Sequence, residues 1–246
     1  MKNKNYEALL SELQKKKMDF ETIKRLENEY TNEIVESLHD LLILLKRDIL
    51  SLQKQKRILL KEQVERFRSD VQLIDLGLPS GTLWADRNLG ANAPENYGDY
   101  FRFGETSPYT EESPRYQYTK IKGSIAGTEY DAATVILGKN FCIPTERQLR
   151  ELVDNCEWQW TEQNGISGMK VTGPNGNSIF LPAAGFRSNS SGTSPSGVRS
   201  YGYCWSATPG SSYGGYSLYF GSSYWGQNNY GRAYGFSVRP VATNHN

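Results

Sequence analysis

Histidine is the residue that this sequence comes closest to lacking, and its scarcity restricts the chemistry open to the protein. The chain has two histidines, His39 in a helix-forming region and His245 near the C-terminus. Neither lies among Cys, Asp or Glu residues at the spacing of a metal site. A catalytic triad or a Cys–His pair would find no candidate histidine in the folded region. No P-loop, dinucleotide-binding glycine motif or zinc-protease motif is present. We therefore expect no metal, no cofactor and no catalytic activity.

Acidic residues are absent from the last third of the chain. All 27 of them occur at or before Glu162, and the last lysine is Lys170. Beyond it, the charged side chains are Arg187, Arg199, Arg232 and Arg239. This region cannot offer carboxylate ligands to calcium, and its polar but nearly uncharged composition is typical of an interface. The formal net charge of +1 gives no general attraction to nucleic acid or membranes, so neither is an expected partner.

Cysteines and long apolar runs are also scarce. The three cysteines, Cys142, Cys156 and Cys204, are odd in number and show no CxxC spacing, which predicts buried thiols rather than a disulfide framework. The longest apolar run, residues 41–45, is far too short to span a bilayer. The N-terminal residues lack the apolar segment of a signal peptide. We expect cytoplasmic synthesis without membrane insertion, with the protein kept soluble in the cytoplasm or assembled there into a larger particle.

Glycine and proline are missing from residues 1–70, which predicts a helical segment. These residues are rich in the helix formers Lys, Glu, Leu, Arg and Gln. Apolar residues recur at heptad spacing in two sets, which differ in register by a slip near Thr31 and Asn32. The sets are Tyr6, Leu9, Leu13, Phe20, Ile23, Tyr30 and Ile34, then Leu38, Leu42, Leu45, Ile49, Leu52 and Leu59.

Two arrangements fit this pattern: one long coiled-coil helix with a stutter, or a helical hairpin. A single long helix cannot bury its apolar stripe alone and needs partner helices. The run LLILL is apolar around more than one face, which favours a bundle of three or more helices. The sequence therefore predicts a homo-oligomer formed through residues 1–70.

Residues 71–246 form the second predicted domain, which begins after a composition break at residues 70–80. Short strand-like segments alternate with turns, and VTGPNGNSIFL predicts a hairpin around Asn175 and Gly176. One helix is evident: Thr145 and Gln148 form a capping box before RELVDNC. The expected fold class is α+β, with mostly antiparallel strands and one or two helices.

The segment from residue 199 to 235 resembles an antibody binding surface in composition. It holds half of the chain's 16 tyrosines, interleaved with Gly, Ser and Asn. Tyrosine and tryptophan provide rigid amphipathic contact area, while Ser, Gly and Asn provide adaptable hydrogen bonds. In the sequence YSLYF, Leu218 and Phe220 alternate with Ser217 and Tyr219, which predicts one core-facing and one open side.

Several motifs in order resemble a bacterial C-type-lectin-like domain family, close to the formylglycine-generating-enzyme branch of that fold. They are DLGLPSGTLWADRNLGA, NYGDYFRFGE, YDAATVILGKNFCIPTERQLRELVDNC, GPNGNSIFLPAAGFRS, YCWSAT and GFSVRPV. Within that fold, the chain is most similar to variable proteins diversified by retroelements in phages and gut-type bacteria. The resemblance covers residues 72–242.

This resemblance implies a receptor- or ligand-binding protein, such as a phage adhesin, with variable positions on one exposed face. The positions that fit are Tyr201, Tyr203, Ser212, Tyr213, Tyr216, Tyr219, Ser222, Tyr224, Trp225, Asn228, Asn229, Tyr230, Arg232 and Tyr234. The scaffold positions between them are Trp205, Leu218, Phe220, Phe236, Val238 and Pro240.

Two departures from related proteins limit what the resemblance implies. The paired reactive cysteines of formylglycine-generating enzymes are not evident, and neither are the signatures of calcium-dependent sugar-binding lectins. The expected partner is a protein or glycan receptor on a target surface. Two alternatives remain: a structural component of a phage or cellular complex with a passive lectin-like domain, and an enzyme using one of the three cysteines.

Overall fold

The chain divides into two compact units, Met1–Arg66 and Phe67–Asn246. The computed structural model describes residues 15–17, 19–21, 32–118, 120–188 and 194–242, and within the long helix it describes side chains from residue 39 onward, except Ser69. Tyr6, Leu9, Leu13, Ile23 and Tyr30 of the predicted heptads lie outside these residues, as does the structure at Thr31. No helix in the described part combines the length and the apolar character needed to cross a membrane.

The first unit contains most of helix α2, Asn32–Asp70. The helical residues 15–17 and 19–21 pack against it: Lys16 Nζ lies 2.8 Å from an Asp48 carboxylate oxygen, and Lys46 Nζ lies 5.7 Å from the centre of the Phe20 ring. A continuous helix would separate Lys16 from Asp48 by about 48 Å. The order of the contacts is antiparallel, so they support the helical hairpin among the two predicted arrangements.

Helix α2 carries both a covered and an uncovered apolar side within the first unit. Leu42, Leu45 and Leu52 of the predicted stripe are buried. Six other large apolar side chains are exposed: Leu41, Ile43, Leu44, Leu50, Ile58 and Leu60. Part of the apolar surface that the sequence places on this helix is therefore uncovered among the described side chains.

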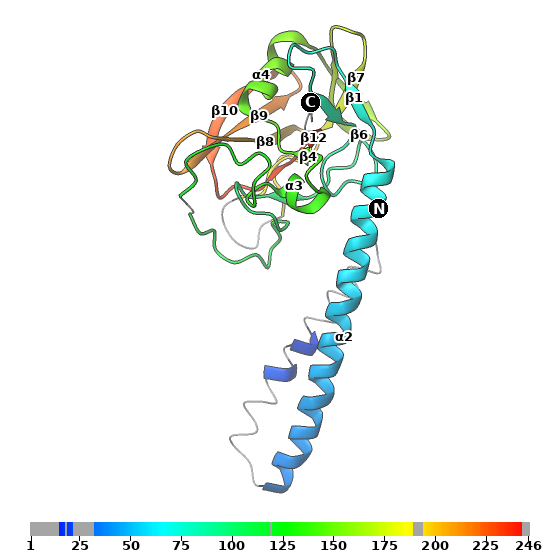
Figure 1. Ribbon diagram of the computed structural model, residues 1–246, viewed down its shortest axis with the longest axis vertical. Helices are drawn as coiled ribbons and strands as arrows, with labels where there is room; N and C mark the ends of the chain where they lie inside the picture. Colours follow the sequence, from blue (N-terminus) through cyan, green and yellow to red (C-terminus); the bar gives the residue numbers. More distant parts are fainter. Residues whose placement is uncertain (1–14, 18, 22–31, 119, 189–193, 243–246) are drawn as a thin grey trace. The chain divides into compact units, whose positions relative to one another are not determined.

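The second unit is a mixed α+β domain of three small, mostly antiparallel sheets (Figure 1). The first sheet has the strand order β1-β2-β12-β4, the second β10-β9-β8-β11-β3, and the third β5-β6-β7. The strands are β1 Leu73–Asp75, β2 Leu83–Ala85, β3 Tyr100–Phe101, β4 Phe141–Cys142, β5 Glu157–Gln163, β6 Ile166–Thr172, β7 Ser178–Pro182, β8 Tyr201–Pro209, β9 Gly214–Gly221, β10 Tyr224–Gly231, β11 Phe236–Ser237 and β12 Val241–Ala242. The β8–β11 pair is parallel.

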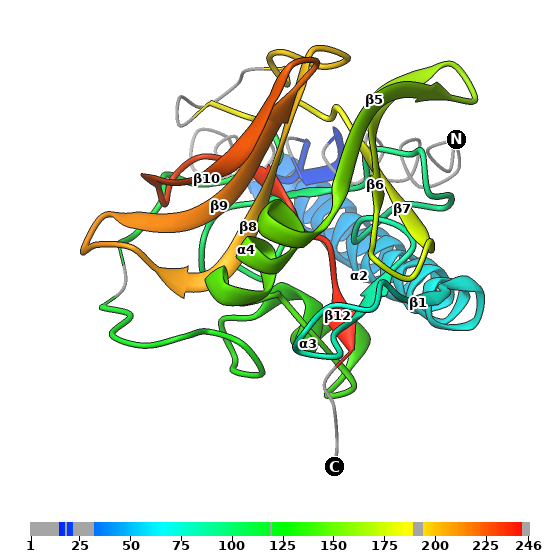
Figure 2. The same cartoon turned by 90° about the horizontal axis from the view of Figure 1, so that it is seen from above.

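Two helices complete the second unit. Helix α4, Glu146–Asn155, begins with the predicted capping box, since Thr145 and Gln148 exchange side-chain and backbone hydrogen bonds. Helix α3, Ala132–Leu137, was not predicted; it is capped by the buried carboxylate of Asp131, which accepts hydrogen bonds from the amides of Ala133 and Thr134. Figure 2 shows α4 between strands β8–β10 on one side and β5–β7 on the other.

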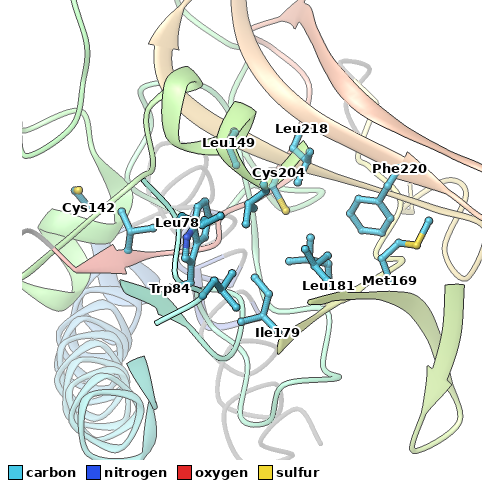
Figure 3. Packing of buried hydrophobic residues seen from close by; sticks show 14 residues of the cluster. Leu78, Trp84, Cys142, Leu149, Met169, Ile179, Leu181, Cys204, Leu218 and Phe220 are labelled. Atoms are coloured by element: carbon cyan, nitrogen blue, oxygen red, sulfur yellow. The ribbon is translucent and has the colours of Figure 1, made fainter. Parts of the chain in front are cut away.

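The core lies where α4 meets the three sheets (Figure 3). Trp84 comes from the first sheet, Leu218 and Phe220 from the second, Met169 and Leu181 from the third, and all are buried. The six scaffold positions predicted near the C-terminus are also buried, which confirms that part of the sequence analysis.

A buried guanidinium joins strands that are distant in sequence. Arg239 is fully enclosed and donates three hydrogen bonds, to Asn88 Oδ1 (2.9 Å), the Ala85 carbonyl (3.0 Å) and the Phe180 carbonyl (2.8 Å). Burial lowers the pKa of Arg239 to about 10, so the side chain stays charged at neutral pH. Its fork of donors matches acceptors from two different sheets.

Candidate functional site

Strands β8, β9 and β10 form a regular antiparallel surface in the tyrosine-rich region. Tyr203 lies opposite Tyr219, which in turn lies opposite Gly226. Successive side chains of a strand point to opposite faces of the sheet. Leu218 and Phe220 enter the core, so Tyr219 and its cross-strand neighbours lie on the other face.

Six tyrosines gather on this second face, which we call the outer aromatic face: Tyr201, Tyr203, Tyr219, Tyr224, Tyr230 and Tyr234. Five of the rings form a chain of direct contacts, and the Tyr234 ring joins them through Phe186 and Phe236. The Tyr203 ring centre is 5.3 Å from that of Tyr230, and Tyr219 links Tyr230 (6.4 Å) to Tyr224 (6.0 Å). Tyr224 is exposed and the other five are half-buried. Six of the eight predicted tyrosines are thus brought together into one surface.

Two buried or partly buried phenylalanines support this network. Phe236 stacks on Tyr203, with ring centres 4.7 Å apart, and on Tyr234 at 6.0 Å. Phe186, before the β8 strand, contacts the rings of Tyr201, Tyr203 and Tyr234 at 5.7–6.3 Å. Such aromatic pairs contribute about 0.5–1.5 kcal/mol each beyond the area they bury, which holds the rings in defined orientations.

Glycines allow two of the tyrosine rings to lie close to the backbone. A Cβ atom at Gly221 would come within 2.5 Å of the Tyr224 ring, and one at Gly226 would lie 3.1 Å from the Tyr219 hydroxyl. The alternation of Gly and Tyr in the sequence therefore has a steric cause: the ring on one strand occupies the space left by the missing side chain on the next.

The loop at residues 101–118 covers the rest of this side of the sheet. Trp205 packs edge-on against Phe103, with ring centres 5.5 Å apart, and its Nε1 donates to the Phe101 carbonyl at 2.8 Å. Tyr116 donates to the Phe103 carbonyl at 2.6 Å. Ser217, predicted to lie on an open side, is fully buried, and Phe103 of this loop lies close to Gly215 on the same strand. The open part of the face is thus limited to the six tyrosines and their neighbours.

The outer aromatic face is uncharged. Burial raises the pKa of Tyr203 and of Tyr230, and the interactions that perturb them further come from other tyrosines and from Asn228. The two hydroxyl groups hydrogen-bond to each other. The face therefore offers neutral hydroxyls and ring surfaces, which suit hydrogen bonding and stacking rather than proton transfer.

Three predicted site residues lie on the opposite, core-facing side of the sheet. Tyr216 is two residues before Leu218 on β9, so its side chain points to the same face of the sheet, and it lies near Arg150 of α4. Trp225 stacks on Trp158 of β5, and its side chain remains 40% exposed. Asn229 is opposite Tyr216 and is exposed. The 14 predicted positions are therefore not one face, because strand alternation divides them between two.

The predicted serines and one tyrosine lie in the turns. Ser222 is exposed in the turn between β9 and β10, while Ser212 and Tyr213 are exposed between β8 and β9. Tyr213 is 69% exposed and contacts Tyr118, whose ring centre lies 5.2 Å away. Asn228 is exposed, and strand alternation along β10 places it on the outer aromatic face together with Tyr224 and Tyr230.

The assignment of Arg232 to an exposed binding face is wrong. Its side chain is 1% exposed and lies over the Phe103 ring at 5.0 Å. Its guanidinium donates to the carbonyls of Gly214 (3.1 Å) and Ser211 (2.7 Å). Arg232 therefore anchors the β8–β9 turn from inside, because a turn whose carbonyls point inward needs a buried donor.

The three cysteines are poor nucleophiles in this fold. Burial raises the pKa of Cys142 to about 12, and the pKa values of Cys156 and Cys204 to about 11. All three are free thiols. Because the thiolate is the reactive form, these groups are almost wholly protonated at neutral pH.

Other candidate sites in the described residues are few. His, Cys, Asp and Glu side chains do not cluster in groups that could hold a metal within the part of the chain that the structure describes. An open cleft of about 340 Å³ borders the third sheet and includes Asp86, Glu162 and Lys170. None of the 14 predicted positions lines it.

Comparison with known proteins places the second unit in a family. A sequence family described as "Domain of unknown function (DUF8237)" matches residues 102–241, which include α3, α4 and the strands from β4 to β12. No curated protein and no solved structure matches the chain. Since the match spans more than half of the sequence, the chain belongs to the DUF8237 family.

Proposed function

We propose that this protein is a non-catalytic binding protein that holds a protein or glycan receptor on its outer aromatic face. The observation that carries the proposal is the network of six tyrosine rings, open to solvent and free of charged groups. Tyrosine provides large contact area at a low cost in conformational entropy, and its hydroxyl pairs with either donors or acceptors.

The construction of the face supports this role. Tyr203 and Tyr230 are held by Phe236 and by each other, so their orientation is fixed before a partner arrives. Preorganised side chains lose little freedom on binding, which improves affinity. The exposed neighbours Tyr224 and Asn228 extend the surface toward the free edge of the sheet.

We further propose that the second unit is a C-type-lectin-like domain of the kind diversified by retroelements. The mixed α+β architecture and the separation of buried scaffold positions from surface tyrosines support this reading. Its genetic test is the neighbouring DNA, where we expect a reverse transcriptase gene and a near-copy of the segment that encodes residues 199–239. A locus with neither would remove the diversification proposal and leave the binding proposal standing.

The first unit is proposed to join copies of the chain into a homo-oligomer. The six exposed Leu and Ile side chains of α2 support association with further helices. Several outer aromatic faces would then act together on a phage tail or a cell surface, which raises avidity without new contacts.

The binding proposal is tested by comparing two double variants of the full chain on glycan arrays and arrays of bacterial surface proteins. Tyr219→Ala with Tyr230→Ala removes the centre of the outer aromatic face, and we expect loss of the spots that the unchanged protein binds. The matched control, Tyr216→Ala with Asn229→Ala, removes a tyrosine and a polar residue from the opposite side of the same strands. Equal binding by both variants, or no spots for the unchanged protein, would count against the proposal.

A further inference from the structure

Strand β10 is an edge strand without the features that normally protect such edges. Sheet edges carry unpaired N–H and C=O groups and are usually protected by charge, proline, a bulge or short length. Strand β10 (Tyr224–Gly231) pairs with β9 over all eight residues without a register shift. It contains no charged residue and no proline. Its residues alternate in pairs between exposed and half-buried, so the edge is accessible.

The other edge strands of the described sheets are protected or short. Strand β5 carries exposed Glu157 and Glu162, and β7 is largely buried and ends at Pro182. Strand β1 has three residues and ends at Asp75, while β3 and β4 have two residues each. The contrast sets β10 apart within the same domain.

The pairing register shows which backbone groups of β10 point to the free edge. Tyr224 lies opposite Gly221, and the two residues between them form the turn. The pair that closes a two-residue hairpin is hydrogen-bonded, and bonding then alternates along the strand. The N–H and C=O groups of Trp225, Gln227 and Asn229 therefore point outward. In agreement, the Asn229 N–H is bound by the Asn228 side chain, at 2.8 Å, and not by β9.

We propose that this edge pairs with β10 of a second copy of the chain. An antiparallel, two-fold pairing would place Gln227 opposite Gln227, and Trp225 opposite Asn229. All outward-pointing groups then find partners once the Asn228 side chain releases the Asn229 N–H. About six backbone hydrogen bonds result. Two-fold dimers are the commonest symmetric assemblies, and they require a surface that is complementary to itself, as this strand is.

The charge distribution favours a second copy over a foreign peptide. No charged side chain on β10 would repel its own copy, and none would select a peptide of opposite charge. The cleft beside the third sheet is lined by no β10 residue, so that cleft does not supply side-chain pockets to a peptide at this edge. Recognition of an extended peptide normally uses such pockets for specificity.

The dimer would also unite two binding surfaces. The two-fold axis of this pairing is perpendicular to the plane of the joined sheet, so equivalent faces of the two copies lie on the same side of that sheet. The two outer aromatic faces would then adjoin across the dimer edge, with Tyr224, Asn228 and Tyr230 of both copies closest to the axis. This association goes beyond the proposed receptor binding and does not require it.

The test uses position 227, which in the proposed dimer lies opposite position 227 of the second copy. Like charges directly opposite on paired strands are destabilising and opposite charges are favourable. We expect Gln227→Lys and Gln227→Glu, each alone in the full chain, to weaken self-association at least ~10-fold in sedimentation velocity at low ionic strength, because the axis juxtaposes like charges. An equimolar mixture of the two should associate to within about threefold of the unchanged protein.

Two further variants control for the side chain and the backbone. The Gln227 amide donates to the Glu146 carbonyl at 2.7 Å, and Gln227→Ala removes this bond while keeping the edge N–H; it should associate normally. Gln227→Pro also removes the N–H, and should weaken association at least ~10-fold. If Gln227→Pro does not fold, the comparison of Gln227→Lys, Gln227→Glu and their mixture tests the proposal without it.

Equal association by Gln227→Ala, Gln227→Lys and Gln227→Glu would overturn the proposal, as would a mixture no stronger than its components. Association through residues 1–70 is common to all variants, so differences at position 227 report on β10. Array binding by the same variants is a separate readout. A failure of the β10 dimer with intact array binding leaves the proposed function in place.

Discussion

Trp158 and Trp225 stack face to face, with ring centres 5.7 Å apart and ring planes 9° from parallel. Trp158 belongs to β5 and Trp225 to β10, so the stack joins two sheets at their edge strands. Trp158 also donates from Nε1 to the Leu152 carbonyl of α4 at 3.0 Å and contacts Phe220 at 6.3 Å. A residue predicted to bind a ligand thus helps to hold the domain together.

Replacement of Trp225 by Ala is expected to lower the free energy of unfolding by about 1–3 kcal/mol, because it removes the stack and uncovers part of Trp158. Trp225→Phe keeps a ring in place and should lose less than half of that amount. Urea unfolding followed by tryptophan fluorescence measures both. Equal urea midpoints for Trp225→Ala and the unchanged protein would show that the stack contributes no stability.

Arg232 provides a test of a buried anchor against an exposed arginine. Arg232→Met leaves the Ser211 carbonyl without its guanidinium donor and removes one donor from the Gly214 carbonyl, which also accepts from the N–H groups of Gly210 and Ser211. We therefore expect a loss of about 1–3 kcal/mol in the free energy of unfolding. The control is Arg199→Met, since Arg199 is largely exposed and lies 3.8 Å from Glu162; its loss should stay below about 0.5 kcal/mol. Similar thermal midpoints for the two variants would contradict the buried role.

The thiols predict a decrease of stability in alkaline solution. The folded-state pKa values, about 12 for Cys142 and about 11 for Cys156 and Cys204, lie above that of an unfolded thiol, about 8.5. The unfolded chain therefore loses these protons first, and the stability they contribute, complete below about pH 8.5, declines as pH rises toward 11–12.

Urea midpoints at pH 7.5, 9 and 10 should fall progressively. Cys156→Ala should make this fall less steep, because it removes one of the three thiols whose pKa is raised in the folded state. In the native state at pH 8, a thiol reagent should label all three cysteines far more slowly than in urea. Rapid labelling of Cys142 or Cys204 in the native protein would show that these thiols are accessible.

Leu45 and Leu50 distinguish the interior of the first unit from its proposed contact surface. Leu45 is 7% exposed and Leu50 is 66% exposed. Leu45→Ala should cost about 2–4 kcal/mol of stability and reduce helical circular dichroism on heating. Leu50→Ala should leave the helical signal unchanged at high protein concentration but weaken oligomerisation, measured by light scattering. Unaltered oligomer size in Leu50→Ala would argue against this surface as a contact.

Local chemistry made several elements predictable from sequence. The capping box at Thr145 and Gln148 starts α4 where expected, and the Asn175–Gly176 turn joins β6 to β7, with Gly176 at a φ of 86°. Both signals depend on neighbouring residues alone. The buried scaffold positions Trp205, Leu218 and Phe236 were also correct, because strand alternation separates them from the tyrosines.

Elements stabilised by distant contacts were missed. Strand β10 has the sequence YWGQNNYG, whose Gly and Asn residues disfavour strands, and it forms because β9 pairs with it along its full length. Helix α3 has six residues and depends on the buried Asp131 cap. Arg232 could have been recognised as an anchor only by knowing that Phe103 and the β8–β9 turn enclose it.

The glycines beneath the tyrosine rings constrain how this surface can evolve. A side chain at Gly221 would require the Tyr224 ring to move, and one at Gly226 would press on the Tyr219 hydroxyl at 3.1 Å. A substitution at one tyrosine position mainly alters the contacts of the neighbouring tyrosines, because the core on the opposite side of the sheet is formed by Leu218 and Phe220. The proposed binding face could therefore take new specificities by substitution at the aromatic positions while the glycines between them are retained, at a cost of about 0.5–1.5 kcal/mol for each ring pair that is lost.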